Sequence, residues 1–156
     1  IKPLHNKNIP LYVKSFINPF EPGTVIKADA AIRKMVPVFI KKEDQILISI
    51  VPRDFSFVMG DNLGTIFHSF MLLGITVNLV EASAVSLDVC VNDEKPRVED
   101  LLEEMRSEFA IVYNDNVEML TIRHYTKEAI VRITNGREVL LEQRTRTTVR
   151  FVVRKI

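Results

Sequence analysis

The order in which two hydrophobic periodicities alternate after residue 36 constrains the fold of this chain more than any other feature. Segments with an apolar residue at every second position predict half-buried strands. Segments in which apolar residues recur every three or four positions predict helices that bury one face. The expected elements, in order, are a strand over 45–51, a helix over 63–73, strands over 75–82 and 85–91, a helix with an apolar stripe over 98–109, and a strand over 110–113.

This order predicts an α+β fold of the ferredoxin-like βαββαβ type, in which an antiparallel sheet carries two helices on one face. Asp61 or Asn62 is placed to cap the first helix, and Gly74 to end it. Cys90 falls on the strand face opposite Val89 and Val91, which predicts an inert, packed thiol. Many functions use this fold, so the order alone does not indicate what the chain does.

After Asp115 the pattern restarts and is cut short. The sequence predicts a strand over 117–125, a short helix over 126–135 and a hairpin over 138–143 and 147–154. This would be a second unit of the same kind, truncated, without its second helix and last strand. An incomplete sheet exposes an edge that needs a partner. Residues 36–40 are the first candidates to supply the missing strand.

Composition excludes several function classes. The 156 residues, 47% hydrophobic and 26% charged, suffice for one domain or two small ones. A net charge of +1 gives no global attraction to nucleic acid or to anionic membranes. The single cysteine fits a reducing, cytoplasmic setting. No apolar run approaches the roughly 20 residues that span a bilayer, so no membrane partner is expected.

Arginines crowd the C-terminal hairpin, and Arg146, Arg150 and Arg154 share one strand face. A sheet that binds RNA stacks bases on exposed aromatic side chains, and none stands on this face. Glu138 and Glu142 on the neighbouring strand can pair with the arginines across the hairpin. We therefore expect a solvated or subunit-facing surface and no nucleic-acid partner.

The first 26 residues carry a second kind of signal. Residues 9–15 suit a strand, and the Asn18-Pro19 and Pro22-Gly23 pairs then turn the chain. This segment resembles the junction at which the catalytic domain of aspartate kinases ends. There a last strand, Ile-Pro-Leu-x-Val, is followed by Asn-Pro-x-x-Pro-Gly-Thr-x-Ile. The matching residues are Asn18, Pro19, Pro22, Gly23, Thr24 and Ile26.

A Gly-Asp-Asn loop before the first helix, and the sequence Gly-Ile-Thr-Val-Asn-Leu-Val-Glu-Ala-Ser-Ala-Val-Ser-Leu-Asp-Val over 74–89, resemble the first ACT domain of the same kinases. The resemblance implies three parts: residues 1–26 as the end of the kinase domain and a linker, 27–115 as a first ACT domain, and 116–156 as a second, truncated ACT domain. It also implies a homodimer formed through the ACT domains.

An effector amino acid presents a carboxylate and an ammonium to its site. Backbone amides at the start of the first helix can hold the carboxylate, Gly60 lets the backbone approach, and the Asn78 carboxamide can accept from the ammonium. In the family that the chain resembles, the corresponding positions contact lysine or threonine at an interface between ACT units. The expected effector-binding residues are Met59, Gly60, Asp61, Asn62, Leu63, Ile75, Thr76, Val77, Asn78 and Ser83.

Two departures from the lysine-responsive relatives leave the effector open. Those relatives have an acidic residue at the position of Asn78, and Thr-Ser-Glu where this chain has Ala82-Ser83-Ala84. Neutral acceptors forgo the charge-assisted hydrogen bonds that are roughly twice as strong as neutral ones. Lysine, threonine and a site that has lost its effector all remain open.

The resemblance therefore indicates the regulatory region of an aspartate kinase, whose upstream kinase domain would use ATP and Mg to phosphorylate the side-chain carboxylate of aspartate. Within this sequence no catalytic residue and no cofactor is expected. His5, His68 and His124 lack metal-ligand spacing, so no metal site is expected either. Two alternatives stay open: a structural ACT dimer that binds no effector, and a stand-alone binding module unrelated to a kinase.

Overall fold

A computed structural model describes residues 1–27, 35–54, 56–58 and 60–155. The chain groups into two compact units, Ile1–Met35 and Val36–Ile156. Of the effector residues expected from sequence, Met59 lies outside the described residues.

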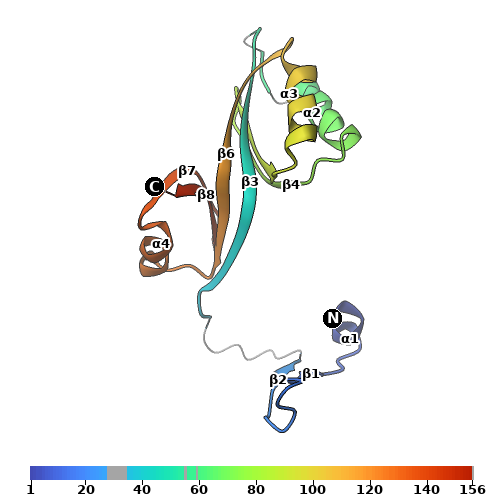
Figure 1. Cartoon of the computed structure of the whole chain (residues 1–156), viewed down its shortest axis with the longest axis vertical. Coiled ribbons are helices and arrows are strands. Elements are labelled where there is room, and N and C mark those ends of the chain that lie inside the picture. The colour runs from blue at the N-terminus through green and yellow to red at the C-terminus, as the bar shows by residue number, and fades with distance from the viewer. Residues whose placement is uncertain (28–34, 55, 59, 156) are drawn as a thin grey trace. The chain divides into compact units, whose positions relative to one another are not determined.

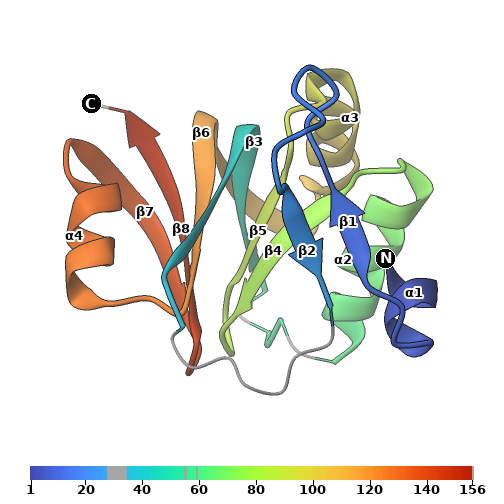
Figure 2. The same cartoon turned by 90° about the horizontal axis from the view of Figure 1, so that it is seen from below.

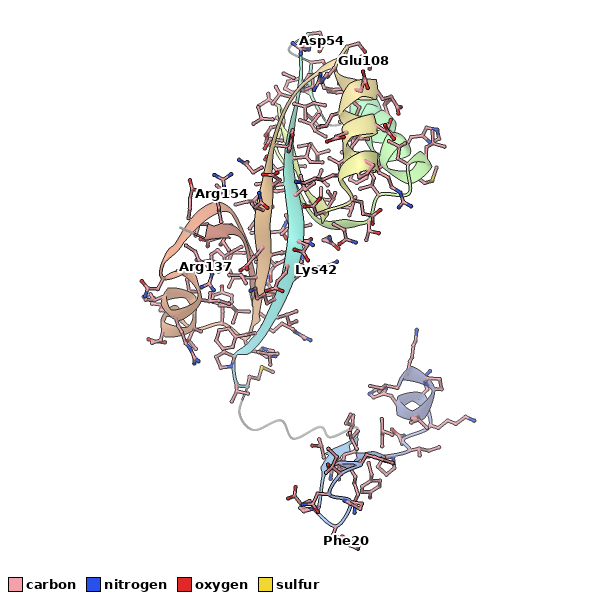
Figure 3. All side chains as sticks on the ribbon, in the orientation of Figure 1. Phe20, Lys42, Asp54, Glu108, Arg137 and Arg154 are labelled. Atoms are coloured by element: carbon pink, nitrogen blue, oxygen red, sulfur yellow. The ribbon has the colours of Figure 1, made fainter. Side chains whose placement is uncertain are left out.

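The first unit is a short helix followed by a two-stranded hairpin. Helix α1 spans Lys2–Asn6, and β1 (Leu11–Val13) pairs antiparallel with β2 (Thr24–Ile26). The expected strand over 9–15 is thus shorter, because Pro10 has no N–H to donate. Its partner is the segment just after the Pro22-Gly23 turn. Phe16, Ile17 and Phe20 are almost fully exposed in this unit (Figure 3).

The second unit (Figure 1) is a six-stranded antiparallel sheet with the strand order β4-β5-β3-β6-β8-β7, which can be followed in Figure 2. The first six elements of this unit run β3, α2, β4, β5, α3, β6, which confirms the predicted βαββαβ order. The elements are β3 Val38–Pro52, α2 Asp61–Leu72, β4 Val77–Ala82, β5 Leu87–Asn92, α3 Lys95–Met105, β6 Phe109–Arg123, α4 Lys127–Thr134, β7 Arg137–Arg144 and β8 Thr148–Lys155.

The helices cover one face of the sheet. Apolar side chains of β3, β5 and β6 on this face pack against α2 and α3, and those of β6 and β8 pack against α4. The prediction of two helices on one face is therefore confirmed. A third apolar cluster lies on the other face, and it confirms the predicted orientation of Cys90. Its buried members are Leu47, Leu79, Cys90, Val117 and Val152.

Two long strands, β3 and β6, join the two halves of the unit. Each has 15 residues. The first part of β3, from Val38 to Lys42, pairs with the last part of β6, from Met119 to Arg123. This confirms that the segment around 36–40 completes the second sheet. In the structure the expected strands over 110–113 and 117–125 form one strand. The polar residues between them fit into it because the pairing of β3 with β6 shifts register there and Asn116 adopts φ 55°. The division at 115/116 falls within β6, and the division into ACT domains stays a prediction.

The sheet is strongly curved, as its end-on view shows (Figure 2). Gln143 on the edge strand β7 donates from Nε2 to the backbone oxygen of Val80 on the other edge strand, β4, at 2.8 Å. The same nitrogen lies 2.7 Å from a carboxylate oxygen of Glu81. The third apolar cluster is thus enclosed between the two edges of the sheet.

Candidate functional site

The expected site residues begin at the start of α2, where the chain leaves β3. Gly60 occupies the N-cap position with φ 95° and ψ −130°, and no described side chain caps the helix. The N-cap position is therefore one or two residues earlier than expected from sequence, and the side chain of Asp61 lies outside what the structure describes. Asn62 donates from Nδ2 to Ser56 Oγ and to the Phe57 backbone oxygen, both at 2.9 Å. Its side chain therefore faces back into the preceding loop and does not cap the amides of the first turn.

The turn that contains Ser83 lies next to this loop. Val58 donates its backbone N–H to the Ala84 oxygen at 2.9 Å. Ser83 Oγ lies 2.7 Å from Ser86 Oγ and accepts the Ser86 backbone N–H at 2.9 Å. The Ser83 hydroxyl therefore closes its own turn. The structure brings Ser83 and the start of α2 to the same end of the sheet.

The remaining expected residues, Ile75 to Asn78, lie at the other end of α2. Ile75 is buried and donates its N–H to the Phe70 oxygen, Thr76 accepts the Asn92 N–H, and Val77 begins β4. A helix of 12 residues is about 18 Å long. Within one chain the amides at the start of α2 and the Asn78 carboxamide therefore do not meet.

Asn78 is at a bulge of β4, between the pairs Val77–Val91 and Leu79–Cys90. Its Nδ2 donates to Gln45 Oε1 at 2.7 Å and to Asn92 Oδ1 at 2.9 Å. Its Oδ1 accepts Lys42 Nζ at 2.6 Å. These partners place the Asn78 side chain at the border of the third apolar cluster, on the face away from α2.

Cys90 borders the same polar group. Its Sγ lies 3.7 Å from Gln45 Oε1, and its side chain is fully buried. Burial raises the pKa of the Cys90 thiol to about 11, against a smaller opposing effect of the Lys42 charge. The thiol is therefore protonated at neutral pH, in agreement with the packed, inert role expected from sequence.

A cavity of about 220 Å³ lies beside the start of α2, and its residues were not expected from sequence apart from Asn62. Arg53 donates from Nε to the backbone oxygens of Arg106 and Phe109, both at 3.1 Å, and so fixes its guanidinium at this end of the sheet. Asp54 and Glu108 lie at the same end (Figure 3). Sequence reasoning missed Arg53 because the residues that orient it follow α3, more than 50 positions later. The lining residues are Pro52, Arg53, Asp54, Asn62, Ser107, Glu108 and Phe109.

A wider, open concavity of about 570 Å³ lies where β3 and β6 are irregular, and it too was not predicted. Glu118 in its wall is 2.9 Å from Lys41 Nζ. Arg154 in the same wall is 3.6 Å from Glu138, which confirms the expected pairing across the hairpin. Glu142 instead pairs with Arg144, its neighbour on β7. Carboxylates dominate the lining, which comprises Glu43, Asp44, Asp93, Asn116, Val117, Glu118 and Arg154.

Two further properties concern the described part of the chain. No group of three or more His, Cys, Asp or Glu side chains there is arranged to hold a metal ion. No helix there is long and apolar enough to cross a membrane.

Comparison with known proteins identifies the architecture. No protein-family model matches the chain. The chain is 30% identical over 95 residues to chloroplastic aspartokinase 3 of Arabidopsis thaliana, a match that covers 61% of this chain and 17% of the plant protein. The structure superposes on E. coli aspartokinase III in complex with lysine and aspartate with a TM-score of 0.75 at 15% identity, covering 98% of this chain and 37% of that one.

A third relative is a C-terminal regulatory domain of aspartate kinase from Porphyromonas gingivalis W83. Its TM-score is 0.64 at 15% identity, over 76% of this chain and 86% of that one. The chain has the fold of an aspartate kinase regulatory region. It spans only a minor part of the plant and E. coli enzymes, 17% and 37% of their lengths.

Proposed function

We propose that this chain is the regulatory region of an aspartate kinase, which senses an end-product amino acid, lysine or threonine, and pairs with a second copy through its ACT domains. The observation that carries the proposal is the likeness to a whole aspartokinase over 98% of this chain, hairpin unit included. The parent enzyme would transfer the γ-phosphoryl group of ATP to the side-chain carboxylate of L-aspartate. ATP and Mg would bind in its upstream kinase domain, and the protein would be cytoplasmic.

The effector carboxylate would bind at the start of α2. The first-turn amides carry a positive partial charge, and Gly60 lets the ligand approach the backbone without a side chain between. Arg53 adds a cation beside the same helix end, held by two backbone oxygens. We propose that Arg53 belongs to this half of the site, together with the expected residues Gly60, Asn62 and Leu63.

The effector ammonium would bind at Asn78 of a second copy. Within one chain the two halves lie at opposite ends of α2, a helix about 18 Å long, so one amino acid would not bridge them. A complete site thus needs two chains, and the homodimer and the effector become parts of one proposal. Because a ligand held by both chains favours the arrangement that brings them together, it shifts the equilibrium between two states of the parent enzyme.

One alternative has support in the structure. The Asn78 carboxamide already has partners in Lys42, Gln45 and Asn92. In a structural dimerisation module that binds no effector, we would expect the hydrogen-bonding groups of Asn78 to have partners within the chain in this way.

Calorimetric titration of the chain with lysine, threonine and methionine separates the two functions, with molar mass by light scattering measured on the same samples. We expect heat and a thermal shift with lysine or threonine, and a dimer. Arg53→Ala should weaken the binding that occurs, and Arg106→Ala, whose backbone oxygen remains, is its matched control. If none of the three amino acids gave heat or a thermal shift, the structural module would be the better account.

A further inference from the structure

The contact between Lys42 and Asn78 joins two strands that are not neighbours in the sheet. Lys42 is on β3 and Asn78 on β4, and β5 lies between these strands. The half-buried Lys42 side chain reaches past the end of β5, and its Nζ donates to Asn78 Oδ1 at 2.6 Å. An ammonium group of the chain itself thus contacts the oxygen that an effector ammonium would need.

The orientation of the Asn78 carboxamide is fixed by its other partners. Gln45 is 1% exposed, and its Nε2 donates to the backbone oxygens of Glu43 and Asp44, both at 2.8 Å. Gln45 Oε1 therefore points at Asn78 Nδ2, which also donates to Asn92. A flipped carboxamide would place its N–H groups against an ammonium and its oxygen against two oxygens. Because both are repulsive, Asn78 Oδ1 stays directed at Lys42.

We propose that Lys42 is an internal competitor for the ammonium of the amino-acid effector and sets the affinity of the site at Asn78. This inference rests on the proposed function. Two ammonium groups on one carboxamide oxygen would lie within a few ångströms and repel each other. The effector must therefore displace Lys42, and the free energy of breaking the Lys42–Asn78 bond is subtracted from its binding.

The position of Lys42 suits such a displacement. It is the last residue of β3 in regular register with β6 before the shift between Lys42 and Gln45. The residues just after it include Asp44, with φ 53°. Displacement of the Lys42 side chain would therefore disturb only the irregular part of β3, where the pairing with β6 is already interrupted.

The test compares dissociation constants for lysine and for threonine in the full 156-residue chain. Lys42→Met keeps the apolar stem and removes the charge, and we expect it to tighten binding about tenfold, since bonds to charged groups are the stronger ones. Lys42→Gln serves as a second neutral variant if Lys42→Met does not fold. Lys42→Arg retains a cation and should stay close to the wild type. Adding Asn78→Ala to Lys42→Met should abolish the gain.

Lys41→Met is the matched control, because Lys41 is the adjacent residue on β3 and pairs with Glu43 and Glu118, not with Asn78. It removes the same charge and should leave the affinity unchanged. Equal binding by the wild type and by both neutral variants at position 42, or an equal gain in Lys41→Met, would overturn the inference and leave the proposed function standing. If no folded variant bound either amino acid, both would be overturned.

Discussion

Helices α2 and α4 begin in opposite ways. At α4, Thr126 is the N-cap, and its Oγ1 accepts the Ala129 backbone N–H at 3.2 Å. At α2 the N-cap is Gly60, no described side chain performs this role, and Asn62 binds the preceding loop instead. One helix is capped by its own sequence, and at the other no described side chain caps the first amides.

The difference supports the proposal that α2 takes part in binding, while α4 has a structural role. A side-chain N-cap stabilises a helix by about 1 kcal/mol relative to alanine, but by only a few tenths of a kcal/mol relative to glycine, so Gly60 costs α2 little stability. In return, the N–H groups and the positive end of the helix dipole stay available to an anionic group. The cavity beside Arg53 lies at the same helix end. The start of α2 is thus the end at which the proposed ligand would bind, whereas the start of α4 is closed by Thr126.

Gly60→Ala should have the largest effect on this comparison. No described atom lies within 4 Å of the position a Cβ would take, so the cost comes from the backbone at φ 95°, a region that costs L residues about 1–3 kcal/mol. We expect a loss of that size in the free energy of unfolding, measured by urea denaturation, together with weaker effector binding. Gly64→Ala is the matched control.

Gly64 lies within α2, and a Cβ there also meets no described atom within 4 Å. Because alanine is the better helix former, Gly64→Ala should stabilise the chain by about 0.5–1 kcal/mol. A Gly60→Ala variant as stable as the wild type would show that the start of α2 does not need its glycine.

Thr126→Ala should have the next largest effect, at the other helix. Loss of the hydroxyl leaves the Ala129 amide without its cap, and we expect a loss of about 1 kcal/mol in the free energy of unfolding. Thr126→Ser keeps the acceptor and should recover most of it. Neither variant should change effector binding. A Thr126→Ala variant that bound the effector more weakly would contradict the assignment of α4 to a purely structural role.

The sequence predicts the elements of this fold better than their limits. Apolar periodicity sufficed to predict α2, α3 and the strands of the first half, because an element that buries one face has its apolar residues at a regular local spacing. The continuity of β3 from Val38 to Pro52 was not predicted, because its charged residues, Lys41 to Asp44, hide the alternation. The separation of β6 into two strands, 110–113 and 117–125, was wrong because polar turn residues can also occupy a bulge inside a strand.

The site is less accessible to sequence reasoning than the fold. Gly60 and Asn78 could be selected from local chemistry and from resemblance. The partners of Asn78 could not, since Lys42 precedes it by 36 positions and reaches it past an intervening strand. Gln45 would have been taken for a surface residue of an alternating strand, yet it is 1% exposed. Its buried amide is satisfied by the backbone oxygens of Glu43 and Asp44 at a strand irregularity, which no spacing rule predicts.

The smallest expected effect concerns pH, and both helix starts take part in it. The Ser56 hydroxyl and backbone N–H lower the pKa of the Asp54 carboxyl before α2. Its own backbone N–H and then the Thr126 hydroxyl lower the pKa of Glu128 in α4. A lowered folded-state pKa contributes stability above the ordinary value, 3.8 for Asp54 and 4.5 for Glu128. That contribution is lost as pH falls through the folded-state pKa.

Both carboxylates are exposed, so solvent screening keeps the change in stability small, and carboxyl chemical shifts measured by NMR are the suitable observable. Ser56→Ala should raise the Asp54 midpoint and leave Glu128 unchanged. Thr126→Ala should raise the Glu128 midpoint only partly, because the backbone N–H, its larger partner, remains. If Ser56→Ala left the Asp54 midpoint unchanged, the loop before α2 would not be held by this carboxylate.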